Sequence, residues 1–237
     1  MVFDQAEFDI RCEWGEHGVT ALAPISDVVV IVDVLSYSTC VEVAASRGAV
    51  VYPYRHRDET AAAFAREVGA ELAVGRGQGR YSLSPGSLQD IPDGARVVLP
   101  SPNGATLTMT TGSTPTLAGC LRNCEAVARA ASRYGTRVAV IPAGERWQAD
   151  GSLRPCFEDW LGAGAIVEYL DGTLSPEAAA ARAAYRAFRD DLPKMLRECN
   201  SGKELIAKGY ADDVDIAAEL NCSNTVPVLK DGAYIAS

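Results

Sequence analysis

The chain has 237 residues, 48% of them hydrophobic, and its 22 Lys and Arg against 31 Asp and Glu give a formal net charge of −9. This ordinary globular composition excludes disordered, collagen-like and coiled-coil proteins. Lys and Arg supply most of the affinity for nucleic acids and anionic lipids, so the acidic balance argues against both partners.

Strand-like aliphatic runs alternate with helical patterns along the first 141 residues. Runs of aliphatic residues predict buried strands, and Ala-rich segments that begin at Ser, Thr or Asp predict helices. In chain order we predict a strand at 28–33, a helix at 38–47, a strand at 49–53, a helix at 58–68, strands at 72–74 and 96–99, a helix at 103–111, a strand at 116–118, a helix at 121–134 and a strand at 137–141. Residues 75–94 are rich in Gly, Ser and Pro and predict a long loop, of a length that is often functional.

The remainder of the chain predicts helices and a final hairpin. The expected elements are a helix at 158–170, a long helix at 175–196, a helical region to about 220 that begins at the capping box Ser201-x-x-Glu204, and strands at 226–229 and 233–235. Alternating strands and helices predict an α/β fold, in which helices cover both faces of a mostly parallel, mixed sheet in three α/β/α layers. We expect one domain over residues 1–237, with two lobes as the alternative.

The N-terminus and the cysteines predict a cytoplasmic protein. MVFDQAEFDI is acidic and lacks the basic segment of a signal peptide, and the longest aliphatic run, 28–32, is too short to span a membrane. The seven cysteines form no CxxC pair, so we expect most to be buried thiols. Cys120 and Cys124 are expected in the core, because no His lies nearby in the sequence to activate them.

Polar residues follow the predicted strands at the point where parallel sheets bind their ligands. They are Asp33, Ser36, Ser38 and Thr39 after the first strand, Ser101, Asn103 and Gly104 after another, Arg122 and Asn123 after the next, and then Gly144, Glu145 and Arg146. Carboxylates, amides and arginines suit a metal with hard oxygen ligands and an oxyanion held by Arg and backbone N–H groups. This set predicts phosphoryl chemistry.

Each of these signals also has a structural explanation. Asp33 could cap the following helix, and the Ser101–Gly104 segment could be a plain turn. Arg122 could be an ordinary surface arginine, and Glu158-Asp159 could be first-turn acids that the helix dipole favours. Together, however, Glu145, Glu158 and Asp159 on one side of the sheet would supply the clustered carboxylates that Mg²⁺ requires.

Seven segments carry a resemblance to a known family. They are VVIVDVLSYST (29–39), LPSPNGAT (99–106), GCLRNCEAVA (119–128), IPAGERW (141–147), EDWLGAGAIV (158–167), SGKELIAKGYADDVDIAAELN (201–221) and VPVL (226–229). In this order, and over nearly the whole chain, they resemble the 2-phosphosulfolactate phosphatase (ComB) family. The chain departs from the family pattern at Ser36-Tyr37, where the family has Arg-Ala, and within the 75–94 loop.

The resemblance implies an α/β fold and Mg²⁺-dependent hydrolysis of a phosphate ester, 2-phosphosulfolactate, on a route to coenzyme M. The implied catalytic residues are Asp33, Glu145 and Arg122; the implied phosphate-binding residues are Ser38, Thr39, Asn103, Gly104, Asn123 and Arg146; the implied metal ligands are Asp33, Glu145, Glu158 and Asp159. Either a water or Asp33 itself attacks the phosphorus. The alternatives are a phosphatase or phosphoryl-transfer enzyme for another small acid and a non-catalytic anion-binding protein. A homodimer is the expected assembly.

Overall fold

The computed structural model describes residues 4–237, so residues 1–3 of the acidic N-terminus lie outside the described part. Its main sheet has nine strands: β1 (Ile10–Cys12), β2 (Val28–Val32), β3 (Val50–Tyr54), β4 (Glu71–Leu72), β5 (Arg96–Pro100), β6 (Thr116–Gly119), β7 (Val138–Pro142), β10 (Pro227–Lys230) and β11 (Ala233–Ala236). Their order in the sheet is β1-β7-β2-β6-β10-β11-β3-β5-β4.

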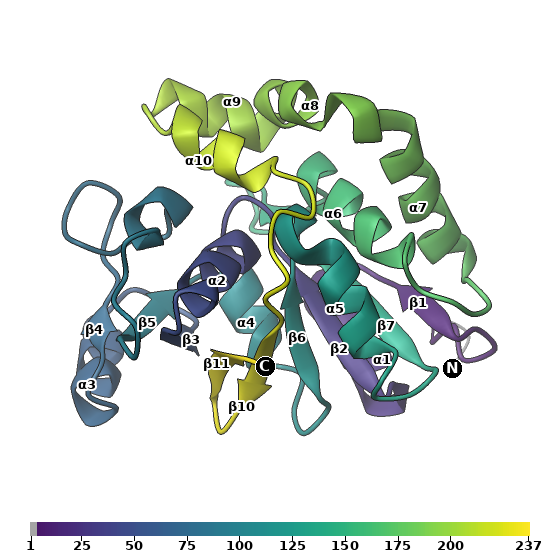
Figure 1. The fold of residues 1–237 in the computed structure, drawn as a ribbon, viewed down its shortest axis with the longest axis horizontal. Helices are drawn as coiled ribbons and strands as arrows, with labels where there is room; N and C mark the ends of the chain where they lie inside the picture. Colours follow the sequence, from purple (N-terminus) through teal and green to yellow (C-terminus); the bar gives the residue numbers. More distant parts are fainter. Residues whose placement is uncertain (1–3) are drawn as a thin grey trace.

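The helices lie on both sides of this sheet (Figure 1). They are α1 (Gly15–Leu22), α2 (Tyr37–Ser46), α3 (Glu59–Glu67), α4 (Gly104–Thr108), α5 (Cys124–Ala131), α6 (Phe157–Val167), α7 (Pro176–Phe188), α8 (Leu192–Glu198), α9 (Asn200–Ala207) and α10 (Ala211–Ala217). Short 3₁₀ turns occur at η1 (Ala23–Ile25), η2 (Pro85–Leu88), η3 (Leu121–Asn123) and η4 (Arg189–Asp191). The predicted α/β/α fold with a mostly parallel, mixed sheet is confirmed.

Strand β2 shows why a continuous aliphatic run forms the centre of this sheet. All five of its side chains are fully buried. Successive side chains of a strand point to opposite faces. Val28, Val30 and Val32 therefore pack with residues of α5, α6 and α7, while Val29 and Ile31 pack with α1 and α4.

The C-terminal hairpin joins two parallel groups of strands. β1, β7, β2 and β6 form one parallel group, and β3, β5 and β4 form the other. Between them lie β10 and β11, which pair with each other and, antiparallel, with β6 and β3. The hairpin predicted from the sequence is thus confirmed, and it joins the two parallel groups of strands into one sheet.

Two predictions for the C-terminal helices are wrong. The helix expected over 175–196 is interrupted at η4, and Pro193, in the first turn of α8, has no N–H with which to continue the helical hydrogen bonds across the break. The capping box at Ser201 is absent, since the capping residue of α9 is Cys199, two residues earlier, whose Sγ accepts the Gly202 N–H at 3.3 Å.

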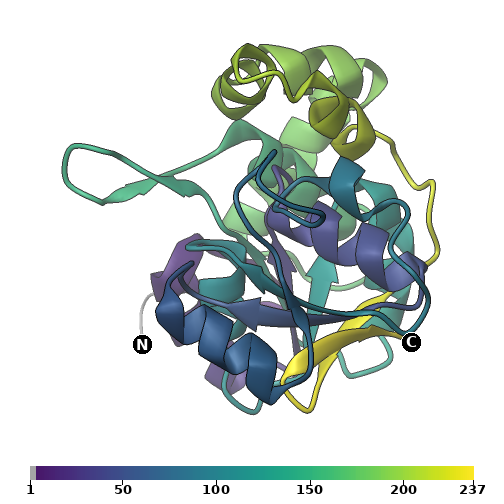
Figure 2. The ribbon, with the colours of Figure 1, turned by 90° about the vertical axis from the view of Figure 1, so that its left-hand side faces the viewer.

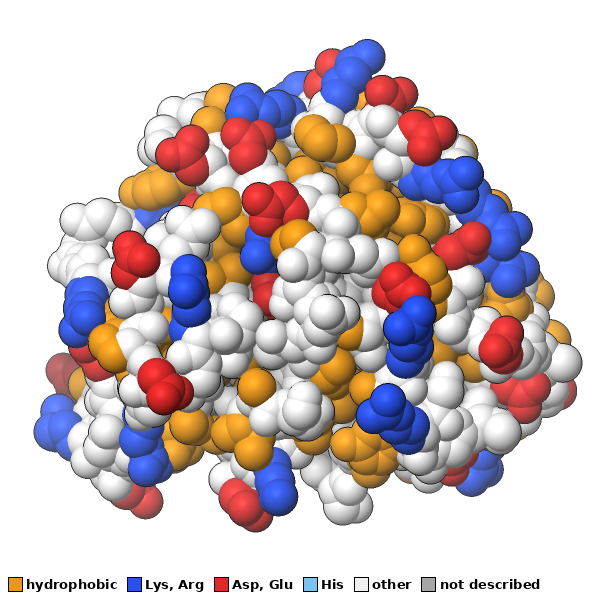
Figure 3. Space-filling model, in the orientation of Figure 1, with side chains coloured by type: hydrophobic (Ala, Val, Ile, Leu, Met, Phe, Trp, Pro, Cys, Tyr) orange, Lys and Arg blue, Asp and Glu red, His pale blue; other side chains and the backbone are white. Residues whose placement is uncertain are grey.

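The remaining surface and core features fit the composition. Six of the seven cysteines, Cys120 and Cys124 among them, are buried thiols, and Cys222 is exposed. Acidic and basic side chains alternate over the face shown in Figure 3. Within residues 4–237, no helix combines the length and the apolar character needed to cross a membrane.

Candidate active site

Asp33 lies directly after β2, at the carboxyl edge of the sheet, and is 6% exposed. Its Oδ1 accepts the Tyr37 N–H at 3.1 Å, and its Oδ2 accepts the N–H of Gly104 at 2.9 Å. Gly104 begins α4, so this carboxylate ties the segment after β5 to the turn after β2. A Cβ at position 104 would lie 2.8 Å from Asp33 Oδ2, so the close approach requires glycine there.

Asp159, in the first turn of α6, makes a parallel arrangement on the other side of Asp33. Its Oδ1 accepts the N–H of Val34 at 2.7 Å, and its Oδ2 accepts the N–H of Gly144 at 2.8 Å. The side chain is buried. It therefore joins the turn after β2 to the loop after β7, and the two aspartates together hold three strand ends in one place.

Burial and neighbouring carboxylates raise the pKa values of Asp33 and Asp159. Burial raises the pKa of Asp33 to about 7, and the charges of Glu145 and Glu158 act in the same direction, against the two backbone N–H donors. Burial, followed by the charges of Asp33 and Glu158, also raises the pKa of Asp159. The site concentrates negative charge in a desolvated place, which is typical of sites built around a cation or a reacting group.

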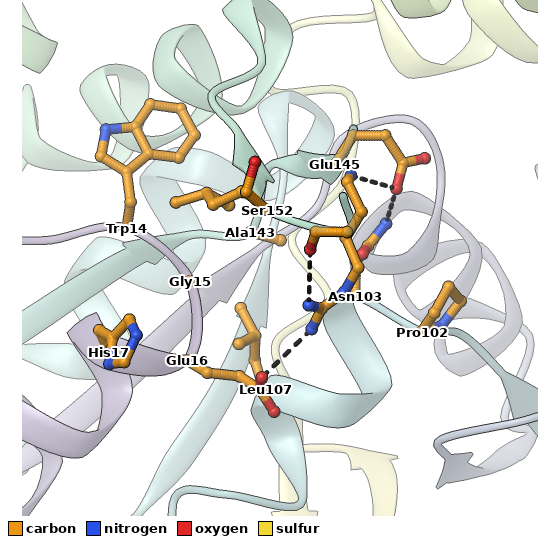
Figure 4. Close-up of a pocket in the computed structure, with 13 residues that line it drawn as sticks. Trp14, Gly15, Glu16, His17, Pro102, Asn103, Leu107, Ala143, Glu145 and Ser152 are labelled. Atoms are coloured by element: carbon orange, nitrogen blue, oxygen red, sulfur yellow. Dashed lines mark hydrogen bonds and ion pairs between the residues drawn. The ribbon is translucent and has the colours of Figure 1, made fainter. Parts of the chain in front are cut away.

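A pocket of about 320 Å³ opens beside this cluster (Figure 4). Asn103 Nδ2 donates to Glu145 Oε1 in its wall. Arg146 crosses the pocket, with Nη2 donating to Glu16 Oε2 at 3.1 Å and Nη1 donating to the Gly151 carbonyl at 3.3 Å. The pocket thus brings the predicted Asn103, Glu145 and Arg146 together, and its volume suits a small ligand.

One wall of the pocket comes from a two-stranded hairpin, β8 (Glu145–Arg146) with β9 (Leu153–Arg154). Figure 2 shows the 145–154 segment projecting from the body of the molecule. Gly144 precedes it with φ +67, a conformation that favours glycine. The hairpin carries Glu145 and Arg146 from the end of β7 to the pocket.

The opposite wall consists of residues that sequence reasoning missed, namely Trp14, Glu16 and His17. They follow β1, whose three residues pair with β7 in parallel and so place the next loop at the same edge. The rule used for the other strands would have selected them, but a three-residue strand gives almost no periodic signal.

Two predicted phosphate-binding residues, Ser38 and Thr39, form hydrogen bonds with the backbone near Asp33. Ser38 Oγ donates to the Ile31 carbonyl at 3.1 Å and accepts the Asp33 N–H at 3.0 Å, and Thr39 Oγ1 donates to the Val34 carbonyl at 2.8 Å. These hydroxyls shape the turn that carries Asp33. Their role in binding phosphate stays a prediction.

Arg122 and Asn123 are likewise engaged away from the pocket. Arg122 Nε pairs with the buried Glu42 at 2.5 Å, and its Nη1 contacts Glu219 of the segment after α10. Asn123 Oδ1 accepts the Cys120 N–H at 2.9 Å, and its Nδ2 donates to the Thr225 carbonyl at 3.0 Å. In this arrangement both side chains stabilise the junction of β6 with the C-terminal segment.

The carboxylates fit Mg²⁺ in their chemistry. Over residues 4–237, no three His, Cys, Asp or Glu side chains form a group arranged to hold a metal ion. Mg²⁺ does not require three, because it keeps several waters and is bound through one or two carboxylates together with substrate phosphate. Asp33 and its charged neighbours supply such oxygen ligands. The donor set is therefore chemically suited to Mg²⁺, and the Mg²⁺ site stays a prediction.

Comparison with known proteins settles the family. A sequence model of the 2-phosphosulpholactate phosphatase family matches residues 19–232. The chain belongs to this family. Membership in the 2-phosphosulpholactate phosphatase family places the chain among phosphoric monoester hydrolases and confirms the resemblance.

Individual relatives agree with the family match. A 2-phosphosulfolactate phosphatase of Methanothermobacter thermautotrophicus is 31% identical over 215 residues, which cover 87% of this chain and 88% of the relative. A probable 2-phosphosulfolactate phosphatase of Gloeobacter violaceus is 29% identical, with 85% and 87% covered. Another from Pseudothermotoga lettingae is 28% identical, with 90% and 94% covered.

Proposed function

We propose that this protein is a Mg²⁺-dependent phosphatase that hydrolyses 2-phosphosulfolactate, or a similar phosphorylated small hydroxy acid, to the hydroxy acid and phosphate. The observation that carries the proposal is the buried Asp33 carboxylate at the carboxyl edge of the sheet, next to a pocket lined by Asn103, Glu145 and Arg146. The names of the relatives support the substrate. We place the enzyme on a route to coenzyme M solely because 2-phosphosulfolactate lies on that route.

The chain's own residues supply binding and positioning. Arg146 and the amide of Asn103 line the pocket and carry N–H groups of the kind that bind phosphate oxygens, although they now donate to Glu16, the Gly151 carbonyl and Glu145. Either an in-line water attacks the phosphorus, with Glu145 placed to accept its proton, or Asp33 attacks and forms a phospho-enzyme that a water then hydrolyses to phosphate. In both routes the ester P–O bond breaks and the hydroxy acid leaves, its alkoxide oxygen taking up a proton from water. Both routes require Asp33 to be ionised, and its pKa of about 7 leaves part of it ionised at neutral pH.

Mg²⁺ would be held by Asp33 together with Glu145 or Glu158. When bound, the ion offsets the negative charge that develops on the phosphoryl oxygens. The raised pKa values of Asp33 and Asp159 support this assignment, because burial, and after it the charges of the neighbouring carboxylates, disfavours their ionised forms, a cost that a divalent cation would offset.

The function is tested by a phosphate-release screen over phosphorylated small hydroxy acids, with Mg²⁺ or with EDTA. We expect phosphate release from 2-phosphosulfolactate with Mg²⁺ and at least about a hundredfold slower release with EDTA. Release from a different acid only would identify the first alternative. Full activity in EDTA would exclude Mg²⁺ dependence, and binding without any release would identify a non-catalytic protein.

Metal-free protein should lose stability as pH rises through the range in which Asp33 ionises. Its pKa rises from 3.8 to about 7 on folding, so the folded state binds more protons between these values. The contribution to stability is complete below pH 4 and is lost as pH rises through 7, at up to about 1.4 kcal/mol per pH unit. Melting curves should therefore show a steeper fall from pH 5 to pH 8 in wild type than in Asp33→Asn.

Added Mg²⁺ gives a readout of the same carboxylates that does not depend on activity. A ligand that binds only the folded state raises the melting temperature. We expect a clear rise at pH 8, where Asp33 is ionised, and a much smaller one at pH 5. Equal shifts at both pH values, or equal shifts in wild type and Asp33→Asn, would contradict a Mg²⁺ site at Asp33.

A further inference from the structure

Arg76 reaches the turn that carries Asp33 from a distant part of the chain. It lies at the start of the 75–94 loop, and its Nη2 donates to Ser36 Oγ at 3.0 Å. The next residue, Tyr37, donates its N–H to Asp33. A guanidinium is thus present one residue from the amide that binds the central carboxylate.

The position of this guanidinium is fixed from several sides. Arg76 Nε donates to Asp213 Oδ2 at 3.3 Å, and its guanidinium carbon lies 5.5 Å from the centre of the Tyr210 ring. Asp213, on α10, is itself buried and accepts Ser84 Oγ at 2.5 Å and the Gly86 N–H at 3.4 Å. The 75–94 loop and α10 therefore hold Arg76 in place, and little side-chain entropy remains to be lost on binding.

Arg76 also keeps hydrogen-bonding capacity. A guanidinium has five N–H donors, and within residues 4–237 only one on Nε and one on Nη2 have acceptors. The side chain is 22% exposed, so part of the group is accessible from solvent. Arg122, by contrast, is occupied by Glu42 and Glu219.

The substrate class supplies a need for such a group. A phosphorylated hydroxy acid carries a carboxylate or sulfonate besides its phosphate, and the four carboxylates of the site repel that second anion. A planar guanidinium binds carboxylate and sulfonate oxygens through paired, charge-assisted hydrogen bonds. Arg76 offers this chemistry at the turn that bears Asp33, and its pairing with Asp213 orients it.

We propose that Arg76 binds the second acidic group of the substrate and so selects phosphorylated acids over neutral phosphate esters. This inference rests on the proposed phosphatase function. It also assigns a role to the 75–94 loop, which the phosphate chemistry alone leaves unused. Asp213 is then a positioning residue, since it acts through Arg76.

The test compares three phosphate esters in wild type and Arg76→Met. The esters are 2-phosphosulfolactate, with carboxylate and sulfonate, 2-phospholactate, with carboxylate alone, and glycerol 2-phosphate, with neither. For Arg76→Met we expect KM to rise about 10- to 100-fold with an acidic ester, kcat to change less than threefold, and kcat/KM for glycerol 2-phosphate to stay within twofold. A loss on 2-phosphosulfolactate but not on 2-phospholactate would assign the contact to the sulfonate.

Arg80→Met is the matched control, because Arg80 is an exposed cation of the same loop that stacks on Tyr81. It should leave all three reactions unchanged. Arg76→Lys keeps the charge but lacks the planar fork, and it should give an intermediate KM if Arg76→Met does not fold.

The results separate this inference from the function on which it rests. Wild type that releases phosphate from none of these esters refutes the proposed function. Active wild type refutes the role of Arg76 if Arg76→Met leaves KM for the acidic esters unchanged, or if it lowers kcat/KM equally for all three esters.

Discussion

Asp33→Asn is expected to reduce kcat/KM for phosphate release by about 10³-fold or more, while the protein remains folded. Asparagine matches aspartate in size but cannot ionise, so it can neither bind a cation strongly nor attack phosphorus. Asparagine keeps one carbonyl oxygen for the two N–H groups of Tyr37 and Gly104, so we expect a loss of about 1–3 kcal/mol for the unsatisfied donor, which still leaves a typical domain folded. Steady-state kinetics together with circular dichroism and a melting curve measure both parts.

The matched control is Asp90→Asn, which removes one negative charge from an exposed residue of the 75–94 loop. It should retain wild-type kinetics. Turnover by Asp33→Asn within tenfold of wild type would contradict the assignment of Asp33 to the reaction. A 10³-fold loss accompanied by unfolding would instead make Asp33 a structural residue that ties Gly104 to the turn after β2.

The sequence predicted that the central residues of the candidate site lie together, because parallel strands end at a common edge. Asp33, Asn103 and Glu145 follow three different strands; Asn103 and Glu145 line the pocket, and Asp33 accepts the N–H of Gly104 beside it. The inference needs only the recognition of each strand and the rule that ligands bind at the carboxyl edge. It failed at β1, where three residues carry too little pattern to be recognised as a strand.

The direction of a side chain could not be predicted by the same rule. Arg122 follows β6 as expected, but Glu42 and Glu219 compete for its guanidinium, and nothing in the local sequence reveals two partners so far along the chain. Ser38 and Thr39 lie where predicted, yet their hydroxyls bond to backbone carbonyls. Position at an edge is set by topology, whereas orientation is set by partners from other elements.

Arg76 was not predicted as a site residue, because its contacts also depend on distant parts of the chain. Its loop has no hydrophobic periodicity, so the sequence indicates only a long connection. Its place beside Ser36 depends on Asp213 in α10, within a C-terminal region whose helix boundaries were themselves predicted incorrectly. A contact between two irregular or poorly predicted segments requires the three-dimensional structure.

Asp159→Ala is expected to lower the free energy of unfolding by about 2–6 kcal/mol. The change removes the acceptor for two buried backbone donors, the N–H groups of Val34 and Gly144, and each unsatisfied donor costs about 1–3 kcal/mol. Such a loss is a large part of the about 5–15 kcal/mol that stabilises a typical domain. Urea denaturation at pH 7 measures it directly.

Two variants define the cause of this loss. Asp159→Asn keeps one carbonyl oxygen and should lose roughly half as much, because one of the two N–H groups retains an acceptor. Asp171→Ala removes an exposed acid and should change stability by less than about 0.5 kcal/mol. If Asp159→Ala lost less than about 1 kcal/mol, the bridge between the loops after β2 and β7 would not be what holds Asp33 and Glu145 together, and the packing of α6 against β7 would have to do so.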